Sequence, residues 1–232
     1  FFAFILFSLF STTWLMLRQP ETLLPAQRRR YRPADIAAAV GEMWSNPTSR
    51  LSTFVQTLVM GMLFGTLSST QQIFDLTYSR GDSFHLWFAL IAVLAATSSV
   101  VNAALVVRLG MRAMIKAMFT AQIGLSAAMI AVLALPLSPA VEFPLYVIWT
   151  VSLFFQAGLC IGNLNALALE PMGHIAGLAA TVITAVATIG AVAIAGPVGL
   201  AFNGTPLPLA LSTLTLATAA LLLTRRIRRD SD

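Results

Sequence analysis

Residues 143–167 read FPLYVIWTVSLFFQAGLCIGNLNAL and contain no charged side chain. A stretch of about 20 apolar residues is long enough to cross the hydrocarbon core of a bilayer as a helix. Backbone groups in lipid must be hydrogen-bonded within their own segment, which makes a helix the expected structure. This stretch therefore predicts a membrane-spanning helix, and the rest of the chain repeats the pattern.

Six further apolar stretches bring the predicted number of membrane spans to seven. The spans are expected at residues 1–17, 51–74, 84–107, 113–137, 143–167, 175–200 and 207–223. The composition agrees, since 58% of the 232 residues are hydrophobic and only 10% are charged. Soluble domains carry about 25% charged residues. The predicted fold class is an all-α integral membrane protein.

The cationic residues predict how the chain is oriented. If the spans alternate in direction, thirteen of the fourteen Lys and Arg residues fall on one side, and Arg80 is the exception. The thirteen are Arg18, Arg28, Arg29, Arg30, Arg32, Arg50, Arg108, Arg112, Lys116, Arg225, Arg226, Arg228 and Arg229. The positive-inside rule makes that side cytoplasmic, with the N-terminus outside and the C-terminus inside. A net charge of +5 clustered between apolar spans indicates membrane lipid as the partner, and no nucleic acid.

The connector at residues 18–50 joins the first two spans and is the longest one. Pro33 suits the first turn of a short helix, and Asp35 suits its positive end. Ile36, Val40, Met43 and Trp44 would share one face of that helix. Two interpretations stay open: a helix lying on the membrane surface, or a hinge-like linker between two helical bundles.

Prolines are expected to interrupt two other regions. Pro136, Pro139 and Pro144 are predicted to form a short turn on the outer side, between two spans. Gly196 and Pro197 lie inside the span at residues 175–200, where they would kink the helix or free a carbonyl. That span is otherwise rich in Ala, Gly and Thr, which let helices approach closely.

Two stripes of polar, aromatic and sulfur-containing side chains lie within the spans. They are Gln56, Met60, Phe64, Leu67 and Gln71 on one span, and Trp149, Leu153, Gln156, Cys160 and Asn163 on another. Amides mixed with aromatic side chains and methionine suit a cavity for amphipathic or aromatic small molecules. The alternative is hydrogen bonding between helices, which stabilises bundles by about 0.6 kcal/mol per contact. The residues predicted to line a substrate cavity are Gln56, Met60, Phe64, Gln71, Trp149, Gln156 and Asn163.

Other kinds of site have little support in this sequence. No Asp, Glu, Lys, Arg or His lies near the centre of a span, and the single cysteine, Cys160, rules out an intrachain disulfide. No metal-binding spacing, phosphate-binding loop or nucleophile motif is present. We therefore expect no catalytic residues, no metal and no cofactor, and we do not expect an enzyme.

Three sequence motifs resemble the Bcr/CflA-type multidrug efflux transporters of the major facilitator superfamily. Arg18-Gln19-Pro20-Glu21-Thr22-Leu23 resembles the exit from that family's sixth helix. Asn102 to Arg112, with Arg108-Leu109-Gly110-Met111-Arg112, is similar to the second copy of the superfamily's cytoplasmic loop motif. Gly162-Asn163-Leu164-Asn165-Ala166 followed by Glu170-Pro171-Met172-Gly173-His174-Ile175-Ala176-Gly177 resembles the tenth-to-eleventh helix region, and is the most specific match.

The resemblance covers nearly the whole chain and implies that its seven spans match helices six to twelve of a twelve-helix carrier. The expected domains are the last helix of an N-terminal bundle (1–17), a cytoplasmic linker (18–50), a six-helix bundle (51–224) and a basic tail (225–232). The family implies proton-coupled export of drugs or small metabolites by alternating access at the inner membrane. The loop residues expected to hold a conformational state are Asn102, Arg108, Gly110 and Arg112, although they could be simple membrane anchors.

The chain is expected to be a fragment or a truncated gene product, because it starts with Phe1 inside an apolar stretch. The family's usual proton site lies in the helices expected to be missing, so no coupling residue is assigned to this chain. Two alternatives to a carrier remain. One is a half-carrier that does not transport. The other is a seven-helix receptor, although the only lysine, Lys116, is badly placed to bind retinal.

Overall fold

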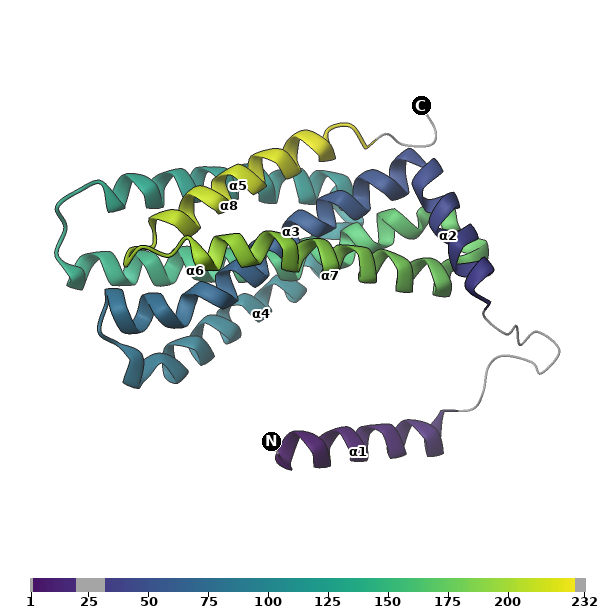
Figure 1. Ribbon diagram of the computed structural model, residues 1–232, viewed down its shortest axis with the longest axis horizontal. Helices are drawn as coiled ribbons and strands as arrows, with labels where there is room; N and C mark the ends of the chain where they lie inside the picture. The colour runs from purple at the N-terminus through teal and green to yellow at the C-terminus, as the bar shows by residue number, and fades with distance from the viewer. Residues whose placement is uncertain (1, 20–31, 228–232) are drawn as a thin grey trace. The chain divides into compact units, whose positions relative to one another are not determined.

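A computed structural model describes residues 2–19 and 32–227 of the chain (Figure 1). Several predictions lie outside the described residues: the motif positions 20–23 and the arginines Arg28, Arg29, Arg30, Arg228 and Arg229. Every regular element in the described ranges is helical. The helices are α1 (Phe2–Arg18), α2 (Pro33–Ser45), α3 (Pro47–Gln72), α4 (Phe84–Leu109), α5 (Met111–Leu133), α6 (Pro139–Leu169), α7 (Ala176–Leu200) and α8 (Leu207–Thr224). Short helical turns cover Ile73–Thr77, Gly81–Ser83 and Glu170–Ile175.

The chain divides into two compact units, Phe1–Ile36 and Ala37–Asp232. The described part of the first unit consists of α1 and the start of α2. No residue of α1 is buried, and the Arg18 guanidinium stacks 5.2 Å from the ring centre of Trp14. The second unit contains the remaining helices and the candidate site described below.

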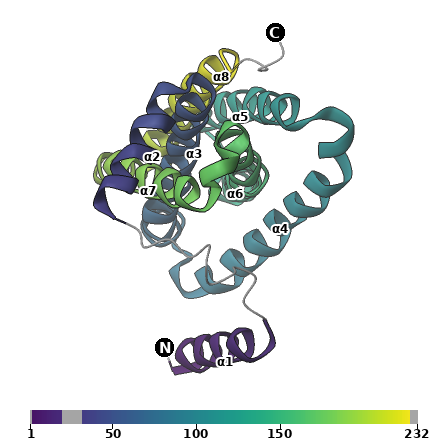
Figure 2. The ribbon, with the colours of Figure 1, turned by 90° about the vertical axis from the view of Figure 1, so that its right-hand side faces the viewer.

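Helix α6 lies in the middle of the second unit (Figure 2). It packs against α3, α4 and α5, and more lightly against α7. Contacts between Ser49 and Ala168 and between Met62 and Gln156 show that α3 and α6 are antiparallel. Because short connections join successive long helices, the described cationic residues of this unit other than Arg80 gather at one end, which we call the basic end. Its described members are Arg50, Arg108, Arg112, Lys116, Arg225 and Arg226.

The core of the second unit is divided along its length. Near the basic end, aliphatic and sulfur-containing side chains of α3, α5, α6 and α8 pack together, with Ile115, Phe119 and Leu164 fully buried. At the opposite end the core is aromatic, and Phe74 packs edge-on against Phe143 at 5.3 Å between ring centres. Edge-to-face packing of this kind stabilises beyond burial alone by about 0.5–1.5 kcal/mol per pair.

The all-α prediction is confirmed, and apolar helices of membrane-spanning length are present as expected. By length and composition, five described helical segments could cross a membrane. One of them covers residues 139–200 and contains both α6 and α7, joined through the turn at Glu170–Ile175. α1 is apolar but shorter, at 17 residues. The number of crossings, seven, stays a prediction.

The prediction for the outer prolines is wrong in part. Pro136 lies in the turn, but Pro139 is the first residue of α6 and Pro144 lies within that helix. Proline is well suited to the first helical turn, because the N–H group it lacks has no partner there. The helix α7 likewise continues through Pro197 and ends three residues later, at Leu200.

Candidate functional site

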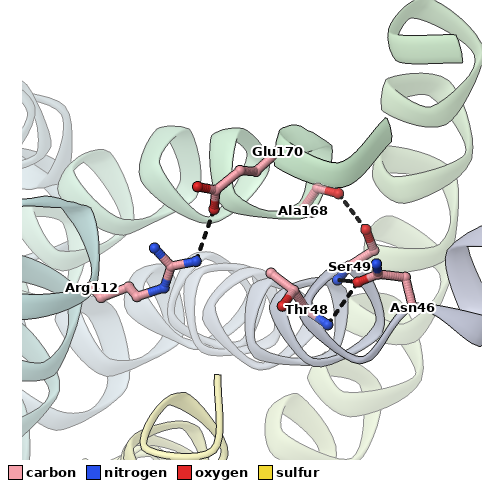
Figure 3. Close-up of polar contacts among 6 residues, drawn as sticks. All are labelled: Asn46, Thr48, Ser49, Arg112, Ala168 and Glu170. Atoms are coloured by element: carbon pink, nitrogen blue, oxygen red, sulfur yellow. Dashed lines mark hydrogen bonds and ion pairs between the residues drawn. The ribbon is translucent and has the colours of Figure 1, made fainter. Parts of the chain in front are cut away.

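The ends of α3, α5 and α6 meet at the basic end, where two polar contacts connect them (Figure 3). The Arg112 Nη2 donates to Glu170 Oε2 at 2.8 Å, joining the start of α5 to the turn after α6. The Ser49 hydroxyl donates to the Ala168 carbonyl at 2.6 Å, joining α3 to the last turn of α6. We call these two interactions the basic-end contacts.

Local sequence explains why these side chains are held in place. Asn46 caps α3, and its Oδ1 accepts the backbone N–H groups of Thr48 at 2.9 Å and Ser49 at 3.1 Å. A cap of this kind satisfies N–H groups that have no partner within the helix. On α5, the preceding Gly110 adopts φ 79°, a conformation that favours glycine. Gly110 alone separates α4 from α5, so Arg112 lies in the first turn of α5.

The four residues predicted for the conformational loop have different positions. Gly110 forms the turn and Arg112 makes the ion pair. Arg108 is exposed at the end of α4. Asn102 lies inside α4, about two turns before its end and within the predicted span at residues 84–107. It accepts a hydrogen bond from the Asn163 Nδ2 at 2.7 Å, which connects α4 to α6.

The α6 stripe faces the interior of the second unit. Trp149, Gln156 and Asn163 are all buried. The Trp149 indole N–H donates to the Ser126 hydroxyl at 3.2 Å, and Asn163 also donates to the Leu159 carbonyl at 2.9 Å. The bond from Trp149 to Ser126 and the bond from Asn163 to Asn102 are interhelical hydrogen bonds, the alternative stated above, whereas the bond to Leu159 lies within α6. They leave the substrate-binding role of the three residues as a prediction.

The α3 stripe changes from buried to exposed along the helix. Gln56 is buried, Met60 and Phe64 are half-buried, and Leu67 and Gln71 are exposed. A surface groove of about 500 Å³ lies where α3 passes α7. It is lined by Phe64, Leu67, Ser68, Val192, Ala195 and Gly196. None of these described lining residues is titratable, so the groove suits an apolar or weakly polar molecule.

Two glutamine carbonyl oxygens are buried without a hydrogen-bond partner in the described part of the chain. They are Gln56 Oε1 on α3 and Gln156 Oε1 on α6. The amide nitrogen of Gln156 points to the Met62 sulfur at 3.7 Å, which is a weak acceptor. A buried acceptor left unpaired costs about 1–3 kcal/mol. Each oxygen is therefore free to accept a hydrogen bond from water or a bound molecule.

Of a buried polar cluster between α5, α6 and α8, the sequence predictions named only Trp149. Ser126 is its centre, contacting Trp149 at 3.2 Å, Gln122 at 3.4 Å and Thr213 at 3.4 Å. Ser152 donates to the Gln122 carbonyl oxygen at 3.3 Å. The signal in the sequence was the spacing of Gln122 and Ser126, four residues apart in an apolar span, which places both on one helix face.

The second unit offers little that could bind a metal. No group of three or more His, Cys, Asp or Glu side chains converges among the residues described.

At the end opposite the basic end, the Tyr78 hydroxyl donates to Glu142 Oε1 at 2.7 Å. Burial, and then this carboxylate, raise the pKa of Tyr78 well above its usual value, so it stays a neutral donor.

No protein-family model, curated protein or solved structure matches this chain.

Proposed function

We propose that the chain is part of a secondary carrier that exports drugs or small amphipathic metabolites by alternating access. The observation that carries the proposal is the groove between α3 and α7. Its volume of about 500 Å³ lies within the range typical of small-molecule sites, about 300–1,000 Å³. Phe64, which the sequence predicted to face a substrate, forms part of its wall.

The chemistry of the second unit supports an amphipathic substrate. The groove presents Phe64 and Leu67 beside the hydroxyl-bearing Ser68. Deeper in the same unit, the unpartnered oxygens of Gln56 and Gln156 supply hydrogen-bond acceptors. An apolar surface with a few polar groups is the usual composition of a ligand site. A relative movement of α3 and α6 would open these oxygens to the substrate.

The basic-end contacts supply a means of holding one conformation. They connect α3 and α5 to the end of α6, and neither interaction is covalent. In the proposed cycle the contacts hold one state of the carrier and separate in the other, as alternating access requires.

The proposed carrier is a multi-pass protein of the inner membrane, related to the Bcr/CflA-type transporters of the major facilitator superfamily. The seven predicted spans match helices six to twelve, with the N-terminus of this chain outside and the C-terminus in the cytoplasm. Protons drive export through residues outside this sequence. The buried polar side chains of α6 carry no charge, and in this proposal they serve substrate binding and helix packing.

The test is export by the product of the complete gene in proteoliposomes. Phe64→Ala and Leu67→Ala remove groove contacts, and Leu94→Ala on α4 is the matched control because Leu67 and Leu94 are both 44% exposed. Losing about 1 kcal/mol of apolar contact should raise the substrate KM about fivefold in the groove variants only.

The buried amides are tested in the same assay with Gln156→Ala, and Gln71→Ala examines the exposed end of the stripe. Gln156→Ala should change the relative rates for substrates that differ in hydrogen-bond donors. Unaltered rates and an unaltered substrate range in Phe64→Ala, Gln71→Ala and Gln156→Ala together would contradict the assignment of this site.

A further inference from the structure

Helix α2 is held against the basic end of the second unit by one of its faces. Met43 is fully buried beside Ala168, Met172 and Ile183, which belong to the end of α6, the following turn and α7. The His174 Nε2 lies 3.0 Å from Glu42 Oε1. The position of α2 on the unit is therefore set by side chains, and its other faces have fixed directions.

A neighbouring face of α2 carries large apolar side chains that the described residues leave partly exposed. Val40 and Trp44 lie four residues apart, on one side of the helix. The ring of Trp44 packs edge-on against Phe54 of α3, at 5.4 Å between ring centres. All three side chains are more than a third exposed. We call Val40, Trp44 and Phe54 the α2 ridge.

A cationic side chain lies next to the α2 ridge. Arg50 lies beside it, where its Nη1 donates to the Trp44 carbonyl at 3.1 Å. The two acidic residues of α2 already have partners, since Glu42 contacts His174 and Asp35 accepts the Arg32 backbone N–H at 2.9 Å.

We propose that the α2 ridge lies in the membrane interface at the basic end and binds anionic phospholipid headgroups through Arg50. Phe54 belongs to α3, a helix long and apolar enough to cross a membrane, so the ridge continues onto a lipid-facing surface. Tryptophan is enriched at the headgroup level because its ring is apolar and its N–H is polar. An arginine next to apolar side chains favours binding to anionic lipid over neutral lipid. The proposal requires only that α3 crosses a membrane and is independent of transport.

The test uses the full chain in vesicles, with the lone Cys160 replaced by Ala and a fluorophore attached at a single new cysteine. Val40→Cys reports on the ridge. Ala38→Cys is the matched control, because it is exposed and two residues away, on nearly the opposite side of α2. Brominated phosphatidylcholine should quench the label at position 40 and leave position 38 unaffected, whereas aqueous iodide should do the reverse.

Headgroup preference is measured at position 40 with brominated phosphatidylglycerol against brominated phosphatidylcholine. Phosphatidylglycerol should quench more strongly. Arg50→Gln should reduce that preference about fivefold, and Arg50→Lys should retain it because the charge remains. Equal quenching by the two lipids, with Arg50 present, would overturn the headgroup assignment.

Two other results would overturn the surface itself. Iodide quenching at position 40 equal to that at position 38 would place the ridge in water. Protection of position 40 from both lipid and iodide would mean that protein covers it, either another part of the full-length product or a second copy.

Discussion

Arg112 and Glu170 form the residue-scale feature with the clearest consequence, because their ion pair joins segments 58 positions apart. Their side chains are 19% and 46% exposed. Water and salt weaken a pair of this kind, so its contribution to stability is about 0–1 kcal/mol. Its importance therefore lies in fixing which helix ends meet rather than in the total stability of the fold.

A double-mutant cycle with Arg112→Gln and Glu170→Gln measures this interaction. We expect each single variant to lower thermal stability slightly, and the double variant to show a coupling free energy of up to about 1 kcal/mol that decreases in high salt. Arg108→Gln is the control, because Arg108 is exposed in the adjoining helical turn. Coupling of Arg108 to Glu170 equal to that of Arg112 would contradict the specific pair.

Single residues were predicted more successfully than their partners. Arg112 and Glu170 each lie in one of the family-like motifs, but the sequence did not indicate that they pair. Asn102 and Asn163 were both identified, one as a loop residue and one as a cavity residue, yet they bond to each other at 2.7 Å. Partners of this kind depend on which helices pack side by side, and local spacing carries no information about that.

At the scale of the elements, the close packing of α3 on α7 depends on glycine. A Cβ added at Gly61 would lie 2.9 Å from Ile194 Cγ2, and one added at Gly190 would lie 2.5 Å from Thr57 Cγ2. Each helix thus supplies a glycine that accepts a branched side chain of the other. Small residues at helix contacts let backbones approach, and the resulting van der Waals packing is one of the forces that associate helices in lipid.

Gly190→Ala should destabilise the protein by about 1–3 kcal/mol, since the new methyl group overlaps Thr57 and forces a shift. Thr57 cannot turn away easily, because its hydroxyl donates to the Thr53 carbonyl at 2.9 Å. Adding Thr57→Ser removes the obstructing methyl group and should restore most of the loss. Melting temperature in detergent is the measurement.

The control for this experiment is Gly124→Ala on α5, where nothing lies within 4 Å of the added methyl group. Alanine has a higher helix propensity than glycine, so this variant should be neutral or more stable. An equal loss at Gly124 and Gly190 would show that glycine matters for another reason, and failure of Thr57→Ser to rescue would exclude the steric explanation.

Helix positions followed from the sequence closely, because runs of apolar residues end where charges and prolines begin. The predicted span at residues 207–223 corresponds to α8 at Leu207–Thr224, and 84–107 corresponds to α4 at Phe84–Leu109.

The π-helical turn at Ile73–Thr77 was not predicted. Its hydrogen bonds accompany the aromatic packing of Phe74, and composition does not distinguish a π turn from an α turn.

At the scale of the whole molecule, the alternation of helices predicts two sets of positions accessible from opposite sides of the membrane. With Cys160 replaced by Ala, single cysteines at Gly173 and Arg226 should react only from the cytoplasm. Cysteines at Ser79 and Asn203 should react only from outside. An impermeant maleimide applied to intact cells and to inverted vesicles makes the measurement.

This labelling also decides whether α6 and α7 cross the membrane separately. Two complete crossings leave position 173 exposed on the cytoplasmic side, whereas protection of this position from both sides would mean that the turn at Glu170–Ile175 stays within the membrane. Labelling of Arg226→Cys from outside would reverse the proposed orientation and would contradict the positive-inside prediction.

The length of α6 has a consequence for the kind of bilayer the molecule tolerates. Its 31 residues extend about 46 Å at 1.5 Å per residue, against a hydrocarbon thickness of about 30 Å. The excess requires the helix to tilt or to carry its ends into the headgroup layers. Glu142 near its start and Asn165 near its end are suited to those polar layers. A thicker bilayer would take in another turn of α6 instead of leaving apolar surface in water.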